Sequence, residues 1–112
     1  MRVIVSGNLT EEEVQALNGA TVFDPDTLDE AIVGVFHGPG GVVAAYSYDL
    51  LVEHFEQEMG EESAMEWVDY NVVRAVPYMG ERAPKILAGL WWNEDDEAAI
   101  IEVAGRRWVA MC

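Results

Sequence analysis

Basic side chains are the scarcest charged groups in this 112-residue sequence. Six Lys and Arg stand against 21 Asp and Glu, which gives a formal net charge of -15 at pH 7. A surface of this sign repels nucleic acids and anionic membranes, and it attracts cations and basic proteins. The composition therefore argues against direct binding of nucleic acid or membrane, and it favours a basic protein surface as the partner.

Cysteine and long apolar runs are also scarce. The single Cys112 cannot form an internal disulfide, which fits a reducing compartment such as the cytoplasm. The longest apolar stretches, Ala31 to Phe36 and Gly41 to Tyr46, are far shorter than the ~20 residues that span a bilayer. The first six residues have the composition of a strand and not of a signal peptide. We therefore expect a soluble, cytoplasmic protein.

Hydrophobic residues make up 51% of the chain, which is enough to build a core in one domain of this length. Intrinsic disorder is therefore not expected despite the charge. The carboxylates are unevenly distributed: residues 1–73 contain fifteen acids and one base, whereas residues 74–112 contain six acids and five bases. Most of the negative field is expected in one part of the fold.

Local patterns in the first half of the chain predict short elements. They are a strand at Arg2 to Ser6, a helix from the Thr10/Glu13 capping box to Asn18-Gly19, a turn at Asp24-Pro25-Asp26, a helical turn from a second capping box at Thr27/Glu30, and a β-hairpin of Ala31 to Phe36 and Val42 to Tyr46 around a glycine-rich loop.

The second half predicts two longer helices and three strands. They are an amphipathic helix from Tyr48 to Met59, a helix opened by a Ser63/Glu66 capping box and ending near Ala75, a loop marked by Pro77, Gly80 and Pro84, a strand at Lys85 to Trp91, a charged turn at Asn93 to Glu97, and a hairpin of Ala99 to Ala104 and Arg107 to Met111. The fold class is therefore α+β, a small antiparallel sheet with two or three helices packed on one face.

Four ordered blocks resemble a family of small accessory proteins from phages and bacterial genomes. The blocks are Asp29-Glu-Ala-Ile-Val-Gly-Val35, Val43-Ala-Ala-Tyr-Ser-Tyr-Asp49, Ala64-Met-Glu-Trp-Val-Asp-Tyr-Asn71 and Gly80-Glu-Arg-Ala-Pro84. Ser47 departs from the family pattern, which usually has Asp there, and so does the segment from Arg74 to Met79. The resemblance implies an accessory protein. It covers residues 29–87, so the single domain expected from the length, residues 1–112, has a family-like core at 29–87 and a C-terminal extension at 88–112. Within these blocks, Asn71 is expected to hydrogen-bond a helix end and Gly80 to form a turn.

Familiar ligand-binding motifs are incomplete in this chain. The loop His37-Gly-Pro-Gly-Gly41 lacks the Gly-Lys-Ser/Thr ending with which a P-loop binds phosphate. A calcium loop starting at Asp24 would need Gly at its sixth position and Glu at its twelfth, which is Val35. His54 could share a metal with a neighbouring carboxylate, but a histidine at the edge of a core is the more common situation. We expect neither a metal nor another cofactor.

Nucleophilic catalysis requires a Ser, Cys or Thr beside a base and an orienting group. None of Ser6, Ser47 and Ser63 lies in a nucleophile-elbow context, and the terminal Cys112 is poorly positioned. Carboxylate pairs are so abundant that they do not single out a general acid or base. We therefore predict that the protein is not an enzyme.

The densest acidic run extends across the two longer helices and their connection. Its members are Glu53, Glu56, Glu58, Glu61, Glu62, Glu66 and Asp69. B-DNA as long as a compact domain of this size, roughly 35 Å, has about 20 phosphate charges. The excess of acids in residues 1–73 is of the same order. We predict that this acidic surface is the partner-binding site of an inhibitor or modulator that mimics nucleic acid and binds a host nucleic-acid-processing protein, as in anti-defence.

Two other interpretations stay open. The acidity could serve solubility or adaptation to high salt, although Glu outnumbers Asp fourteen to seven and the hydrophobic content is high. The many aromatic residues could support a homodimer. Because the adjacent Trp91 and Trp92 cannot both face inward from a regular strand, these two with Trp108 are candidates for self-association. The alternative is that the rings complete the core of a single chain.

Overall fold

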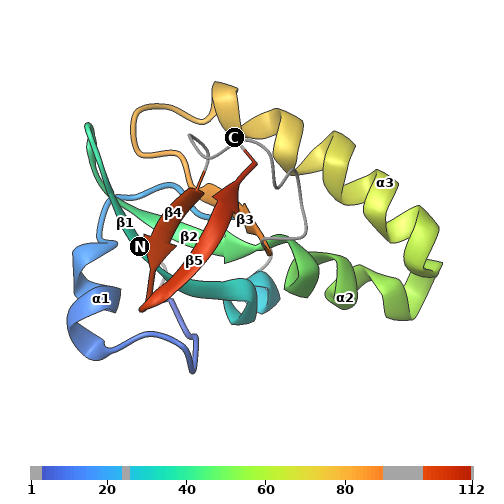
Figure 1. Ribbon diagram of the computed structural model, residues 1–112, viewed down its shortest axis with the longest axis horizontal. Helices are drawn as coiled ribbons and strands as arrows, with labels where there is room; N and C mark the ends of the chain where they lie inside the picture. Colours follow the sequence, from blue (N-terminus) through green and yellow to red (C-terminus); the bar gives the residue numbers. More distant parts are fainter. Residues whose placement is uncertain (1–3, 24–25, 90–99, 112) are drawn as a thin grey trace.

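A computed structural model describes residues 4–23, 26–89 and 100–111. In chain order its elements are α1 (Glu11–Ala16), the 3-10 helix η1 (Asp26–Ala31), β1 (Ile32–Gly38), β2 (Gly41–Ser47), α2 (Tyr48–Met59), α3 (Glu61–Asn71), the 3-10 helix η2 (Val73–Tyr78), β3 (Lys85–Ala88), β4 (Ile100–Val103) and β5 (Arg106–Ala110) (Figure 1). The architecture is α+β, as the sequence predicts, with one five-stranded sheet and two main helices.

The strand order of the sheet is β1-β2-β3-β5-β4. Three of its four ladders are antiparallel, including the two predicted hairpins, but β2 and β3 pair in parallel, with Tyr46 opposite Ile86. Helices α2 and α3 explain the exception. The first carries the chain away from the end of β2 and the second brings it back, so β3 runs in the same direction as β2 and pairs with its last three residues, Lys85 opposite Ala45.

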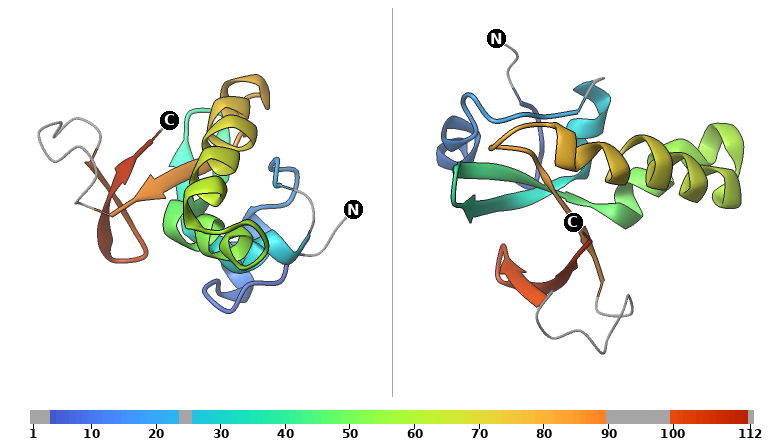
Figure 2. Two further views of the ribbon diagram at one scale, coloured as in Figure 1. Left: turned by 90° about the vertical axis from the view of Figure 1, so that its right-hand side faces the viewer. Right: turned by 90° about the horizontal axis from the view of Figure 1, so that it is seen from above.

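The sheet curls until its two edge strands, β1 and β4, touch. A Cβ atom on the buried Gly34 of β1 would lie only 2.5 Å from a methyl group of Val103 in β4, so this close approach requires glycine. The curl encloses a small core of Ala45, Leu87, Val103 and Trp108. In Figure 2 the β4–β5 hairpin, at the curled end of the sheet, lies away from α2 and α3.

The larger core lies between the other face of the sheet and the helices. Successive residues of a strand point to opposite faces, so Tyr46 faces the helices while its neighbour Ala45 faces the curl. Tyr46 is fully buried; its hydroxyl accepts a hydrogen bond of 3.0 Å from the backbone N–H of Phe23, and the two rings meet edge to face. Leu51 of α2 and Val68 of α3 complete this layer.

The predicted strand at the N-terminus is wrong for its described part, residues 4–6. The N–H of Val5 donates to the carboxylate of buried Asp29 at 3.1 Å, and the hydroxyl of Ser6 donates to the carbonyl of Ile32 at 2.9 Å. These contacts to one side chain and one carbonyl take the place of the hydrogen bonds that a strand would make with a neighbouring strand.

The capping box of Thr10 and Glu13 is confirmed, with reciprocal hydrogen bonds of 3.1 and 2.9 Å at the start of α1. The helical turn predicted near Thr27 is confirmed as η1, but it begins at Asp26 and therefore includes Thr27 instead of being capped by it. The predicted turn at Asp24-Pro25 and the charged turn at 93–97 lie outside the described residues.

Candidate protein interaction surface

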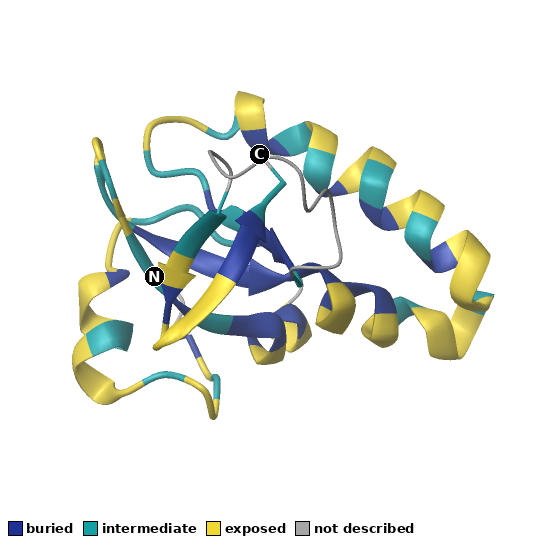
Figure 3. Cartoon of the chain, in the orientation of Figure 1, coloured by how far each residue is buried: buried dark blue, intermediate teal, exposed yellow. Residues whose placement is uncertain are grey.

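Helices α2 and α3 form a hairpin, residues 48–71, that extends past the end of the sheet (Figure 2). We call this hairpin the helical arm. The buried residues of α2, namely Tyr48, Leu51 and Val52, all lie in its first five positions, where the arm joins the sheet. Toward the tip, Phe55 and Met59 are only half-buried and the outer surface is exposed (Figure 3). Helix-to-helix packing therefore holds the outer half of the arm.

A single glycine joins the two helices of the arm. Gly60 has a φ of 82°, a conformation that favours glycine, and its N–H donates to the carbonyl of Glu56 at 2.9 Å. Its own carbonyl accepts from the N–H of Ala64, so it ends one helix and begins the next. The capping role predicted for Ser63 is therefore wrong, because α3 starts at Glu61 and Ser63 lies inside the first turn.

The helical arm contains eight carboxylates and no Lys or Arg in its sequence. Six of the seven predicted contact residues are exposed on it, and these are Glu53, Glu56, Glu58, Glu61, Glu62 and Glu66. The predicted acidic run is thus brought together on one projecting structure.

Asp69 differs from the other predicted contact residues. It is half-buried, and its carboxylate accepts a hydrogen bond of 3.0 Å from the hydroxyl of Tyr48, whose side chain is 1% exposed. Burial and this neighbouring carboxylate raise the pKa of Tyr48 to about 12. Asp69 therefore helps to join α3 to the beginning of α2, and it is less accessible to a partner.

A groove of about 490 Å³ runs between the two helices on one side of the arm. Its rim includes Glu53, Glu56 and Glu61 together with Asp49, which the sequence-based prediction did not include. Val52 and Met65 line the same groove. The rim of this groove is acidic on both helices.

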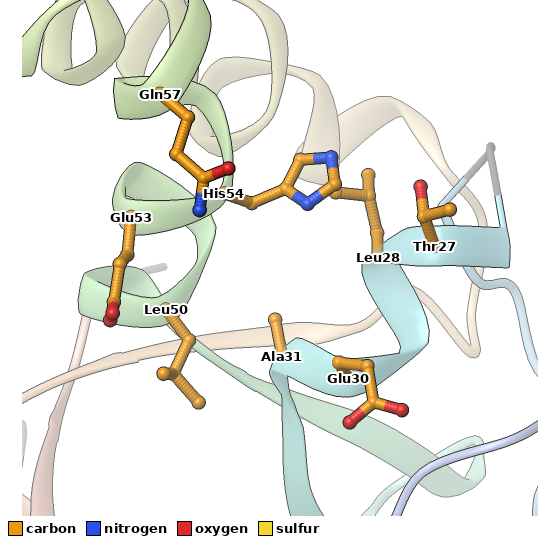
Figure 4. A pocket seen from close by; sticks show the side chains of 8 residues that line it. All are labelled: Thr27, Leu28, Glu30, Ala31, Leu50, Glu53, His54 and Gln57. Atoms are coloured by element: carbon orange, nitrogen blue, oxygen red, sulfur yellow. The ribbon is translucent and has the colours of Figure 1, made fainter.

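A smaller hollow of about 190 Å³ lies between α2 and η1 (Figure 4). The ring of His54 extends across it toward Leu28, while the carboxylates of Glu30 and Glu53 lie on separate elements. Among the described residues, no group of three His, Cys, Asp or Glu side chains is placed to hold a metal ion.

Outside the arm, the cationic side chains of Arg82 and Arg106 contact uncharged groups. The guanidinium of Arg82 donates four hydrogen bonds of 2.7 to 3.0 Å to the carbonyls of Ala16, Asn18 and Val42. Arg106 lies over the ring of Trp108. The Arg82 contacts tie the end of α1 to the start of β2, so this cation serves the fold.

Close packing against Glu81 and Arg82 explains the glycine-rich loop, which forms the turn of the predicted β1–β2 hairpin. A Cβ atom on Gly40 would lie 2.8 Å from the carbonyl of Glu81, and one on Gly41 would lie 3.1 Å from Nε of Arg82. The glycines permit this close packing, and the loop has a structural role. Gly80, with a φ of 93°, forms the expected turn just before this segment.

Trp108, a candidate for self-association, is 6% exposed and lies in the core inside the curl, where its indole N–H donates to the carbonyl of Val103 at 3.1 Å. Its ring therefore completes the core of the single chain and is not presented to a second copy. The other two candidates, Trp91 and Trp92, lie outside the described residues.

The outward orientation of two aromatic side chains on α3 was not recognised from the sequence. Trp67 is 38% exposed and Tyr70 is 62% exposed. Their spacing of three residues indicates a common side of the helix, which was the available signal. At the end of this helix Asn71 donates from its side chain to the carbonyl of Trp67 at 3.0 Å, as expected of a residue at a helix end.

Comparison of the chain with protein-family models, curated proteins and solved structures gave no match. In the described part of the chain, every helix is too short or too polar to cross a membrane. The structural basis for a functional hypothesis is therefore the helical arm itself.

Proposed function

We propose that this protein is a non-enzymatic acidic binding protein that inhibits or modulates a nucleic-acid-processing protein. The helical arm enters a channel lined by Lys and Arg, and its carboxylates take the positions of phosphates. The observation that carries the proposal is the concentration of eight carboxylates, without a base, on a hairpin that extends away from the sheet.

The charge density of the arm supports this assignment. A helix of 12 residues, the length of α2, is ~18 Å long. Duplex DNA of that length has about ten phosphate charges. The eight carboxylates of the arm are comparable in number, and most of them are exposed. A cationic channel that holds DNA would therefore find a similar charge on this surface.

The test uses two variants that change the same charge at two matched places. Glu61→Lys with Glu62→Lys alters the first turn of α3 on the arm, and Glu11→Lys with Glu12→Lys alters the first turn of α1. Each tagged protein is incubated with nuclease-treated bacterial lysate. The retained proteins are identified by mass spectrometry, and the affinity of each purified candidate is measured over a range of salt concentrations.

The wild-type protein is expected to retain a DNA- or RNA-binding protein whose affinity falls steeply as salt rises. The α3 variant should lose at least ten-fold in affinity, whereas the α1 variant should lose much less. Equal losses in both variants would mean that net charge, and not the arm, determines binding. Retention of the protein itself without another partner would favour a self-associating domain whose acidity serves solubility.

A further inference from the structure

The outer side of α3 presents aromatic rings next to its carboxylates. The rings of Trp67 and half-buried Phe55 are in contact, with centroids 4.2 Å apart and planes inclined by 39°. Tyr70 follows Trp67 by three residues, so its ring lies next along the same side of the helix. Phe55, Trp67 and Tyr70 together form what we call the aromatic face of the arm.

One side of α3 packs into the core, whereas the side with Trp67 and Tyr70 stays exposed. Ala64 and Val68 are fully buried against the rest of the fold, whereas Trp67 and Tyr70 are 38% and 62% exposed. Exposed Trp and Tyr are enriched at the centres of protein interfaces, where they contribute a large share of the binding energy. The aromatic face is therefore a candidate contact surface.

The neighbours of the rings indicate a cationic group as the occupant. The guanidinium of Arg74 already lies over the ring of Tyr70, with its central carbon 4.3 Å from the ring centroid. Glu66 precedes Tyr70 by four residues and is exposed on the same side of the helix. An aromatic ring beside a carboxylate complements arginine, whose planar cation stacks on the ring while it pairs with the acid.

Charge argues against two other occupants. A second copy seated on this face would bring together two arms that each have eight carboxylates and no base. An anionic membrane would be repelled for the same reason. Neither repulsion applies to a basic partner.

We propose that the aromatic face binds an arginine side chain of the partner, which stacks on Trp67 while the exposed carboxylates of the arm attract its charge. This inference rests on the proposed function and specifies the chemistry of its partner. Carboxylates attract Lys and Arg to a similar degree, whereas stacking on a ring favours the planar guanidinium. The arm should therefore prefer arginine to lysine.

The test compares two labelled peptides of equal length and charge, one alternating Arg with Gly and the other alternating Lys with Gly. Fluorescence anisotropy at low salt measures the affinity of each peptide for the full chain. The wild-type protein is expected to bind the arginine peptide about two- to five-fold more tightly, the range of an exposed cation–π contact. Trp67→Ala should abolish this preference, and Glu66→Gln should weaken the binding of both peptides.

Two further variants keep the test decisive. Trp67→Leu keeps an apolar side chain without a ring, so it provides a second variant if Trp67→Ala folds poorly, and it should also abolish the preference. Tyr78→Ala removes a ring that is 90% exposed on η2, outside the arm, and should leave the preference unchanged. Equal, salt-sensitive binding of both peptides by the wild type would overturn this inference and leave the proposed function standing. Failure of both peptides to bind would count against both proposals.

Discussion

The helical arm and the segment around Arg82 use charge in opposite ways. In the arm, six of the predicted acidic contact residues are exposed, and neither helix contains a base. At the other end of the sheet, the guanidinium of Arg82 donates four hydrogen bonds to three carbonyl groups. One region keeps its charges exposed, and the other uses its cation within the fold.

This difference shows which charges are available to a partner. A partner that approaches Arg82 would have to replace hydrogen bonds that the fold already makes. A partner that approaches the arm would displace mainly water and counterions from exposed carboxylates. The comparison predicts that a mutation at Arg82 changes stability, and that mutations of the exposed carboxylates of the arm change binding with small effects on stability.

The largest effect on stability is expected from Arg82→Met, which keeps much of the aliphatic stem and removes the guanidinium. The carbonyls of Ala16 and Asn18 can rehydrate because both residues are exposed, whereas the carbonyl of Val42 is left in a partly buried position. We expect the free energy of unfolding to fall by about 3 kcal/mol, since hydrogen bonds to charged groups contribute about 1.5–3 kcal/mol each. Urea denaturation at neutral pH measures the change.

Arg107→Met is the matched control, because Arg107 is an exposed residue of β5. Exposed substitutions of this kind change stability by about 0.5 kcal/mol or less. Equal losses in the two variants would show that positive charge in general, and not the contacts of Arg82, stabilises this acidic protein.

A smaller effect is expected at the base of the arm, where Tyr48 joins Asp69. Burial and the hydrogen bond raise the pKa of Tyr48 to about 12, against 10.0 for the ordinary side chain. Because the folded state holds this proton more tightly, its contribution to stability is fully present below pH 10. The contribution is lost as the pH rises from 10 to 12, and its size is on the order of 2 kcal/mol.

Urea denaturation at pH 8, 10 and 11.5 can follow this loss, with Tyr48→Phe as the control. The variant should be less stable than the wild type at pH 8 because Asp69 loses a donor. Its stability should then decline less between pH 10 and 11.5, since it lacks the titrating hydroxyl. Parallel declines in the two proteins would assign the alkaline loss to other groups.

The elements that could be predicted from the sequence are those whose signals lie in residues close together in the chain. Helix α2 has the predicted bounds, because its apolar residues recur with the period of a helix and Gly60 follows its last residue. The start of α3 was predicted three residues late, because the Ser63/Glu66 pattern resembles a capping box whereas Gly60 makes the turn. The parallel pairing of β2 and β3 depends on the path of the intervening helices, which no local pattern records.

Part of the candidate surface could also be predicted from the sequence. Charged side chains on amphipathic helices are normally exposed, so the acidic run could be placed in solvent from sequence. The burial of Asp69 could not, because it depends on the position of Tyr48 at the start of another helix. The role of Arg82 was also hidden, since its three acceptors lie 40 to 66 residues away in the chain.

The smallest expected effect is a gain in stability when one carboxylate of the arm is removed, a change that should weaken binding. Glu66 lies four residues after Glu62 and three before Asp69 on α3, so its negative charge repels both. We expect Glu66→Gln to raise the free energy of unfolding by about 0.3 kcal/mol at low salt, and this gain should shrink at 0.5 M salt because surface charges are screened.

Glu61→Gln is the contrasting variant, since Glu61 lies in the first turn, where a carboxylate interacts favourably with the helix dipole. It should therefore lower stability slightly. Thermal denaturation of both variants at two salt concentrations measures these changes, and a loss of stability in Glu66→Gln at low salt would contradict the idea that this carboxylate is present for binding at a cost to the fold.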